Sequence, residues 1–211
     1  MSATNAKPAG RVAHDRSPRT SRKSAAERRA EIADAAETLA REAGLSAITM
    51  RAVAAQLGVA PTLVVHHVPS MDGLVADTFE RIVAAELAEV SSSVQEVAEG
   101  GERLETLLRI VLDGTRTEVT QVWVESWVLG RKNPNLAERV RTQSTAWRAC
   151  LAACIEDGVR AGVYRAGDTE AVAGQLLGMI DGIGAHSLVG WHDDDHRVEL
   201  MLRAARAMLR G

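Results

Sequence analysis

Residues 49–68 read TMRAVAAQLGVAPTLVVHHV and contain two short apolar segments on either side of one glycine. Thr49 is a residue type that favours the N-cap of a helix, because its hydroxyl accepts a hydrogen bond from an orphan backbone N–H. Gly58 gives the backbone freedom for a tight turn, and Pro61 fits the first position of a second helix. The inward positions are Val53, Ala54, Leu57, Val59, Val64 and Val68. This layout predicts a helix-turn-helix.

The second of these helices is the part that would meet DNA. In a helix-turn-helix, the second helix lies in the major groove and its N-terminal part faces base edges. The outward positions are expected to be Thr62, Leu63, His66 and His67. A threonine hydroxyl can bond a base or a phosphate, a leucine can contact a thymine methyl, and a histidine can donate to a phosphate. An ordinary helix pair inside a helical bundle is the alternative.

Positive charge is concentrated at the N-terminal end of the chain. The net charge is −3, yet residues 1–29 carry eight Lys or Arg against Asp15 and Glu27, a local charge of +6. Residues 1–23 are rich in Ser, Pro, Gly, Ala and Arg and lack periodicity, which predicts a disordered basic tail. A basic end on an acidic body indicates a polyanionic partner. A tail whose charge only improves solubility is the alternative.

The rest of the sequence has the pattern of an all-α protein. Apolar residues recur at helical spacing from Ile32 onward, and Gly44 is placed to end the first helix. Between Pro69 and Pro134, and from Pro134 to the end, no proline interrupts the chain, and strand signals are nearly absent. We expect about nine helices, near residues 24–43, 50–57, 61–67, 71–96, 102–115, 118–130, 135–161, 168–189 and 194–210.

The sequence shows no sign of membrane insertion or export. No stretch approaches the roughly 20 uninterrupted apolar residues of a membrane span, and the N-terminus lacks the apolar core of a signal peptide. We therefore expect a cytoplasmic protein. Cys150 and Cys154 are interpreted as small buried hydrophobes, and a redox pair is the alternative.

Catalytic motifs are missing from the sequence. It contains no Gly-x-Ser-x-Gly, no His-Glu-x-x-His, no phosphate loop and no dinucleotide fingerprint, which argues against an enzyme and against a bound cofactor. The string HDDDH at residues 192–196 resembles a set of metal ligands. We interpret it as a solvated turn that caps the last helix, because acids are favoured at a helix N-terminus, and so expect no metal site.

Residues 24–74 resemble the DNA-binding domain of the TetR family of repressors. The likeness rests on Ala43-Gly44-Leu45, Thr49, Val53-Ala54, Leu57-Gly58-Val59, Pro61 and Ser70-Met71-Asp72-Gly73-Leu74, the last of which matches the family's start of helix four. Further segments are similar to the BetI-like branch: Val122–Leu136, Ala161–Tyr164 and Ile180–Ile183. The resemblance implies DNA contacts from Thr49, Arg51, Ala60, Pro61, Thr62, Leu63, His66 and His67.

Four positions depart from the family's pattern. The family usually has Tyr at Val65, Phe at Val68 and Lys at Met71, and Ala60 replaces the usual serine cap. The Tyr and the Lys normally touch the DNA backbone, so their replacement predicts weaker binding with a flatter salt dependence. The basic tail can compensate by reaching along the duplex.

Three of the four tryptophans, Trp123, Trp127 and Trp147, fall within residues 102–189. Trp123 and Trp127 are four residues apart and share one face of a helix, which favours a ligand cavity; core filling is the alternative. Asp181 and His186 are candidate polar anchors of a ligand, or polar residues with structural partners. The resemblance favours the cavity, because the family binds small effectors among helices four to eight.

The last two predicted helices are candidates for a dimer interface. The segment 169–189 contains Gly174, Gly178, Gly182 and Gly184, which allow another helix to approach closely, and the final helix is strongly apolar. The resemblance implies a four-helix interface between two subunits; packing within one chain is the alternative. A two-fold dimer suits the reading of a palindrome.

The sequence thus predicts a basic tail (1–23), a helix-turn-helix domain (24–70) and a ligand-binding and dimerisation domain (71–211). The expected function is that of a repressor that binds a palindromic DNA operator as a homodimer and is released by a small-molecule effector. The helix that starts near Ser70 links the two domains and is the expected lever. A ligand-binding or adaptor protein of the same fold, with weak or lost DNA binding, is the alternative.

Overall fold

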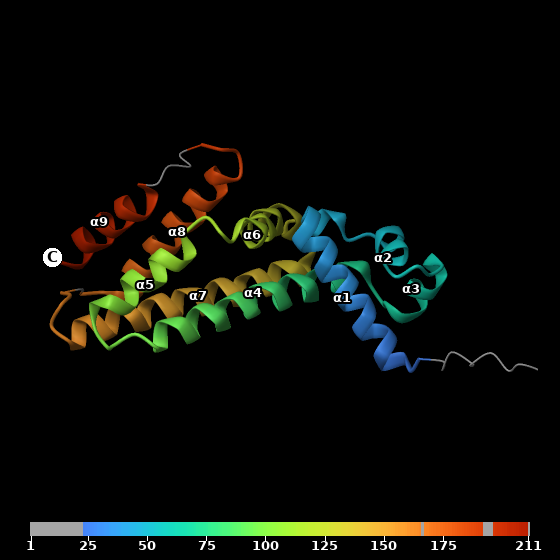
Figure 1. Cartoon of the computed structure of the whole chain (residues 1–211), viewed down its shortest axis with the longest axis horizontal. Helices are drawn as coiled ribbons and strands as arrows, with labels where there is room; N and C mark the ends of the chain where they lie inside the picture. Colours follow the sequence, from blue (N-terminus) through green and yellow to red (C-terminus); the bar gives the residue numbers. More distant parts are fainter. Residues whose placement is uncertain (1–22, 166, 192–195, 211) are drawn as a thin grey trace, which may run out of the picture.

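The computed structural model describes residues 23–165, 167–191 and 196–210, and all of their regular secondary structure is helical (Figure 1). The all-α prediction is confirmed. In chain order the described helices are α1 (Ala25–Ala43), the short 3-10 helix η1 (Leu45–Ala47), α2 (Met50–Gln56), α3 (Pro61–His67), α4 (Met71–Gln95), α5 (Gly101–Val111), α6 (Thr117–Gly130), α7 (Pro134–Arg160), α8 (Thr169–Ser187) and α9 (Arg197–Leu209).

Two of the sequence-based predictions fall on residues outside these ranges. They are the basic tail, apart from Lys23, and most of the string at 192–196. Within the described part of the chain, no group of three or more His, Cys, Asp or Glu is placed to hold a metal ion. No helix there is long and apolar enough to cross a membrane. Cys150 and Cys154 are both free, and Cys154 is buried in the core.

The fifth helix ends earlier than the pattern predicted. The sequence suggested a helix to residue 115, but α5 ends at Val111. Gly114 has a positive φ of 83°, which a helix does not accommodate. The Asp113 carboxylate accepts hydrogen bonds from the backbone N–H of Thr115 at 2.8 Å and from its hydroxyl at 2.7 Å. Hydrogen bonds to the Asp113 side chain therefore replace helical backbone hydrogen bonds at this point, and the helix ends.

The structure also contains a short element that the sequence did not reveal. Gly44 ends α1 with a φ of 85°, and the chain then turns directly into η1. Leu45 and Ile48 on either side of this turn are buried in the core. The connection between α1 and α2 is therefore a packed element of the N-terminal domain.

The molecule is elongated, and the helix-turn-helix lies at one end (Figure 1). The helices α1, α2 and α3 form that end, and α9 lies at the opposite end. The long helices α4 and α7 run side by side between them, and α7 also packs against α5, α6 and α8. Helix α4 follows directly on the helix-turn-helix and runs into the larger domain.

The hydrophobic core is continuous along the length of the molecule. Ile32 and Val64 form part of it among α1–α3, and Phe79, Leu108 and Ile155 among α4, α5 and α7. Fully burying one such side chain contributes roughly 1.5–3 kcal/mol to folding. Packed side chains therefore connect α4 and α6 with the N-terminal helices.

Candidate functional site

The turn between α2 and α3 has the geometry expected from its sequence. Gly58 adopts a φ of 63°, and the backbone N–H of Val59 donates to the carbonyl oxygen of Ala54 at 2.9 Å. The Thr49 hydroxyl accepts a hydrogen bond from the backbone N–H of Ala52 at 3.1 Å and so caps α2. Pro61 is the first residue of α3. The two short helices are thereby held against each other at a fixed turn.

Helix α3 presents a mixed polar and apolar face to solvent. Val64 is completely buried, and Thr62, Val65 and His66 on the opposite side are exposed. Leu63 and His67 lie at the edges of this face and are half-buried. Of the four residues expected to face outward, Thr62 and His66 are therefore the best placed to meet a base. Val65 is 52% exposed and adds an apolar group to this face.

The remaining candidate DNA-binding residues surround α3. Arg51, Ala60 and Pro61 are exposed. Thr49 is also exposed, but its hydroxyl is already engaged in capping α2. Any contact of Thr49 with DNA would therefore share or replace that cap.

The start of α4 differs from the family's usual arrangement. Ser70 caps the helix by accepting a hydrogen bond from the backbone N–H of Gly73 at 3.3 Å. Met71 is half-buried and packs against the core, where the family usually has a lysine. Val68 lines an open groove between α1 and α4, at the position where a phenylalanine would occupy more space. The junction therefore keeps the family's cap but lacks its phosphate-binding side chain.

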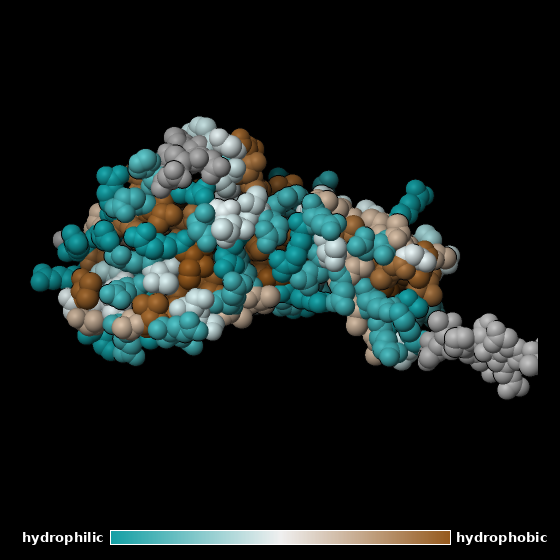
Figure 2. Space-filling view, viewed as in Figure 1, coloured by the Kyte–Doolittle hydropathy of each residue, from teal (hydrophilic) through white to brown (hydrophobic). Residues whose placement is uncertain are grey.

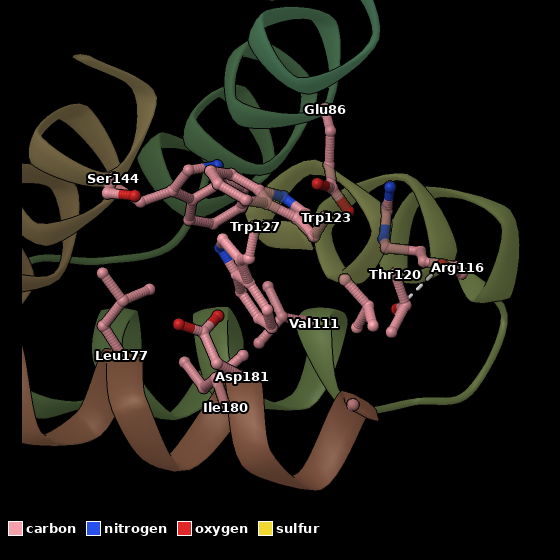
Figure 3. Close-up of a pocket in the computed structure, with 13 residues that line it drawn as sticks. Glu86, Val111, Arg116, Thr120, Trp123, Trp127, Ser144, Leu177, Ile180 and Asp181 are labelled. Carbon is pink, nitrogen blue, oxygen red and sulfur yellow. Dashed lines mark hydrogen bonds between the residues drawn. The ribbon is translucent and has the colours of Figure 1, made fainter. Parts of the chain in front are cut away.

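A second candidate site lies inside the larger domain, between α4, α5, α6, α7 and α8 (Figure 3). We call it the indole cavity; it is a partly open hollow that communicates with solvent. Its lining residues are Glu86, Val111, Arg116, Thr120, Trp123, Val124, Trp127, Ser144, Trp147, Leu177, Ile180, Asp181 and Gly184.

The structure brings four of the five candidate ligand-binding residues together in this cavity. Trp123, Trp127, Trp147 and Asp181 all line it. Trp123 also stacks edge-to-face on Phe79 in the core, with ring centroids 5.1 Å apart. His186 is not among the lining residues. In all, the cavity has three indole rings and two carboxyl groups.

The carboxyl groups of Glu86 and Asp181 lie on opposite sides of the cavity, with indole rings between them (Figure 3). Burial raises the pKa of the Glu86 carboxyl to about 7, against the opposing influence of Arg116 and a hydrogen bond from Trp123. Burial alone raises the pKa of the Asp181 carboxyl to about 6. Each acid is thus poised to gain or lose a proton near neutral pH, and a cation that entered the cavity would favour the ionised forms.

Two of the lining residues also carry a buried N–H group without a hydrogen-bond partner. Among the described residues, Arg116 Nε and Trp147 Nε1 are buried and have no hydrogen-bond partner. An Nη atom at the end of the Arg116 guanidinium donates a hydrogen bond to the Glu89 carboxylate at 2.8 Å. A buried donor without a partner is costly, so a ligand oxygen that accepted from it would be stabilised.

The polar residues of the cavity were largely missed in the sequence. Glu86 comes from α4, far from the tryptophans along the chain, and Arg116 immediately precedes α6. His186 was selected instead, and its ring lies against Trp191 with centroids 4.3 Å apart. The helical position of Glu86, inside an apolar stretch of α4, was the one available signal.

Comparisons with solved structures show the same fold in other organisms. A transcriptional regulator from Saccharomonospora viridis in complex with choline is 24% identical, with a TM-score of 0.75, over 84% of this chain and 95% of that one. A TetR transcription regulator from Haloarcula marismortui is 22% identical, with a TM-score of 0.71, over 87% of this chain and 97% of that one. For Salmonella enterica GusR the identity is 22%, the TM-score 0.65 and the coverage 86% and 94%. No curated protein matches the sequence.

Family comparisons cover both ends of the chain. Residues 32–78 match the bacterial regulatory proteins of the tetR family, and this segment holds the helix-turn-helix. Residues 100–211 match the C-terminal domain of BetI-type transcriptional repressors, which holds α5 to α9 and most of the indole cavity. The members of this family are transcriptional regulators and not enzymes. The chain belongs to the TetR family of DNA-binding transcriptional regulators.

Proposed function

We propose that the protein is an effector-responsive repressor, which binds a palindromic operator as a homodimer and leaves it when a small molecule occupies the indole cavity. The observation that carries this proposal is the combination of an exposed recognition face on α3 with a separate cavity of polar and aromatic character. Helices α4 and α6 both line the cavity and both pack against α1 at the DNA-binding end. Such a regulator acts on the chromosome, which in bacteria and archaea lies in the cytoplasm.

The dimer is supported by the open face of α8. A Cβ atom added at Gly178 or at Gly182 would meet nothing within 4 Å, so this face is free to receive another helix. Val189 and Leu200 beyond it are 79% and 50% exposed. Figure 2 shows hydrophobic surface at the end of α8 next to the residues drawn in grey. Exposed apolar area beside a stripe of small residues favours helix packing between two subunits.

The cavity fits a small organic cation that also carries an oxygen atom. Cations bind over indole faces, and the carboxyl groups of Glu86 and Asp181 provide the opposite charge. The buried N–H groups of Arg116 and Trp147 have no partner among the described residues and would donate to an oxygen if the lining adjusted around the ligand. The choline bound to the regulator from Saccharomonospora viridis has this chemistry and makes choline the first probe to test.

The second candidate function is a ligand-binding adaptor with weak DNA binding. It is favoured by the half-buried Met71 and by the apolar Val65, which stand where the family usually touches phosphates. We prefer the repressor because Thr62 and His66 remain exposed on α3, where they can contact base edges.

The test is a selection of bound sequences from random duplex DNA by the full chain. The repressor predicts a palindrome whose half-sites lie about one helical turn apart. Fluorescence anisotropy with that duplex then measures release by choline, and light scattering measures the mass of the free protein. Recovery of no preferred sequence would favour the adaptor; a palindrome that choline and related cations fail to release would leave a DNA-binding protein with a different effector.

A further inference from the structure

Helix α6 has two functional faces on opposite sides. Thr120, Trp123, Val124 and Trp127, spaced at helical intervals, line the indole cavity. Glu118, Gln121 and Glu125 occupy the other side of the helix, since 3.6 residues make one turn. That side packs against α1 and η1 of the helix-turn-helix domain. A ligand in the cavity would therefore push on a helix whose far side touches the DNA-binding end.

Glu125 makes the most specific contact across this boundary. One carboxylate oxygen accepts a hydrogen bond from the backbone N–H of Ser46 at 2.9 Å. The other oxygen accepts from the side-chain amide of Gln121 at 2.9 Å, which fixes the orientation of the carboxylate. Hydrogen bonds to a charged acceptor are stronger than neutral ones. Glu125 therefore binds the backbone of the turn that follows α1 in a fixed orientation.

The backbone comes unusually close to α6 at this point. A Cβ atom at Gly44 would collide with the Glu125 carboxylate and with the side-chain nitrogen of Gln121. Gly44 is also in the left-handed region at a φ of 85°, so both the conformation and the space at this position suit glycine alone. The absence of a side chain lets the carboxylate reach the Ser46 amide.

The turn that Glu125 binds is connected to the recognition helix by buried side chains and backbone hydrogen bonds. Leu45 and Ile48 anchor it in the core, and Thr49, the next residue, caps α2. The backbone N–H of Val59 is bonded to Ala54 of α2, which fixes the start of α3. A movement of α6 that pulls on Ser46 is thus passed through packed elements to α3.

We propose that the Glu125 carboxylate is the positioning residue that couples occupancy of the indole cavity to the orientation of the helix-turn-helix. Its biological meaning rests on the proposed function, in which that orientation decides operator binding. A bound effector shifts α6, the Glu125–Ser46 hydrogen bond carries the shift to the turn, and the two recognition helices of the dimer change their spacing.

The structure offers a way to move α6 without a ligand. Gly184 of α8 faces α6, and a Cβ atom there would lie 3.1 Å from the side-chain methyl of Thr120. Valine at position 184 would place a larger group in this contact and act as a wedge from the cavity side. Gly184→Val therefore imitates an occupied cavity.

The experiment compares amide resonances of the full-length protein by NMR. The wedge Gly184→Val is introduced into the wild type and into Glu125→Ala, and chemical shifts are followed over residues 44–48. We expect Gly184→Val to change the chemical shifts of these amides in the wild type. This change, the wedge response, should be at least threefold smaller in Glu125→Ala. Exchange of the Ser46 amide with solvent should be at least tenfold faster in Glu125→Ala, since its acceptor is gone.

The matched control is Glu118→Ala, which removes a carboxylate from the same side of α6. Glu118 makes an ion pair with Arg41 at 3.7 Å and no hydrogen bond to the backbone of the turn, so the response to Gly184→Val should match the wild type. Glu125→Gln keeps an acceptor oxygen and the size of the side chain, and should give an intermediate response if the alanine variant folds poorly. Equal wedge responses in the wild type and in both Glu125 variants would overturn the proposal.

A second arm separates this proposal from the repressor function. In anisotropy measurements on the selected duplex, the ratio of operator affinities without and with choline should shrink at least threefold in Glu125→Ala. If the wedge response depends on Glu125 but choline leaves DNA binding unchanged, the coupling stands and the proposed effector class is wrong. A wild-type choline effect that persists undiminished in Glu125→Ala would contradict the coupling and leave the repressor intact.

Discussion

Replacing Glu86 by glutamine should stabilise the protein above neutral pH. Burial raises the pKa of this carboxyl from 4.5 to about 7, so the folded chain retains a proton that the unfolded chain has already released. One pH unit of difference between the two pKa values corresponds to about 1.36 kcal/mol, so the ionised form costs up to about 3 kcal/mol of folding free energy at pH 8. Glutamine has a similar size and carries no charge at any pH, so the variant avoids this cost.

The sign of the effect follows from the raised pKa. The contribution of Glu86 to stability is fully present below pH 4.5 and is lost as the pH rises through about 7. The variant and the wild type should therefore differ least at pH 4 and most at pH 8. For a chain of this length, the difference at pH 8 corresponds to a rise in Tm of roughly 6–12 °C.

Urea unfolding followed by tryptophan fluorescence at pH 4, 6 and 8 measures these free energies. The control is Glu89→Gln, because Glu89 is an exposed carboxylate whose pKa is lowered by its hydrogen bond to Arg116. That variant should gain no stability at pH 8. A Glu86→Gln variant whose advantage is the same at all three pH values would refute the reasoning, because the gain would then be unrelated to ionisation.

Three further predictions concern the ligand, the DNA and the dimer. Choline affinity should rise between pH 5 and pH 7 as Asp181 ionises, because burial raises the pKa of that carboxyl to about 6. In Asp181→Asn, calorimetry should show roughly tenfold weaker choline binding and a weaker dependence of the affinity on pH. Thr62→Ala and His66→Ala should each weaken operator binding by about 1–3 kcal/mol in anisotropy with unchanged circular dichroism, and wild-type affinity in both would place the recognition face elsewhere. Gly178→Glu should yield monomers in light scattering, whereas Gly167→Glu, also free of neighbours, should remain dimeric.

The helix-turn-helix could be predicted from the sequence because its signals are local. Pro61 marks the first residue of α3, Gly58 marks the turn and the buried Val64 sets the face, and the helix 61–67 agrees with the structure at both ends. The end of α5 could not be predicted from apolar spacing, since the side chain of Asp113 competes with the helix for backbone N–H groups. Local hydrogen bonding of this kind overrides periodicity over a few residues.

Four lining residues of the indole cavity, Trp123, Trp127, Trp147 and Asp181, were candidates from the sequence, but their arrangement was not predicted. Trp123 and Trp127 were found by their spacing on α6. Glu86 and Glu125 were missed because each acts through a residue distant in the chain: Glu86 opposes Asp181 across the cavity, and Glu125 meets Ser46, 79 residues earlier. Such pairings are set by the packing of α4, α6 and α8, for which helical periodicity contains no information.

The surface charge near α3 indicates how this chain could bind DNA without the family's usual phosphate contacts. Arg81, on the first part of α4, is engaged by Asp34 and by Glu37, each at 2.7 Å, so its charge is compensated within the protein. Arg29 and Arg51 are exposed and form no ion pair with any described residue. The largest excess of positive charge lies in residues 1–29, which carry +6. Counterion release scales with the number of phosphates neutralised, so the salt dependence of operator binding should be set by this N-terminal segment rather than by the junction of α3 and α4.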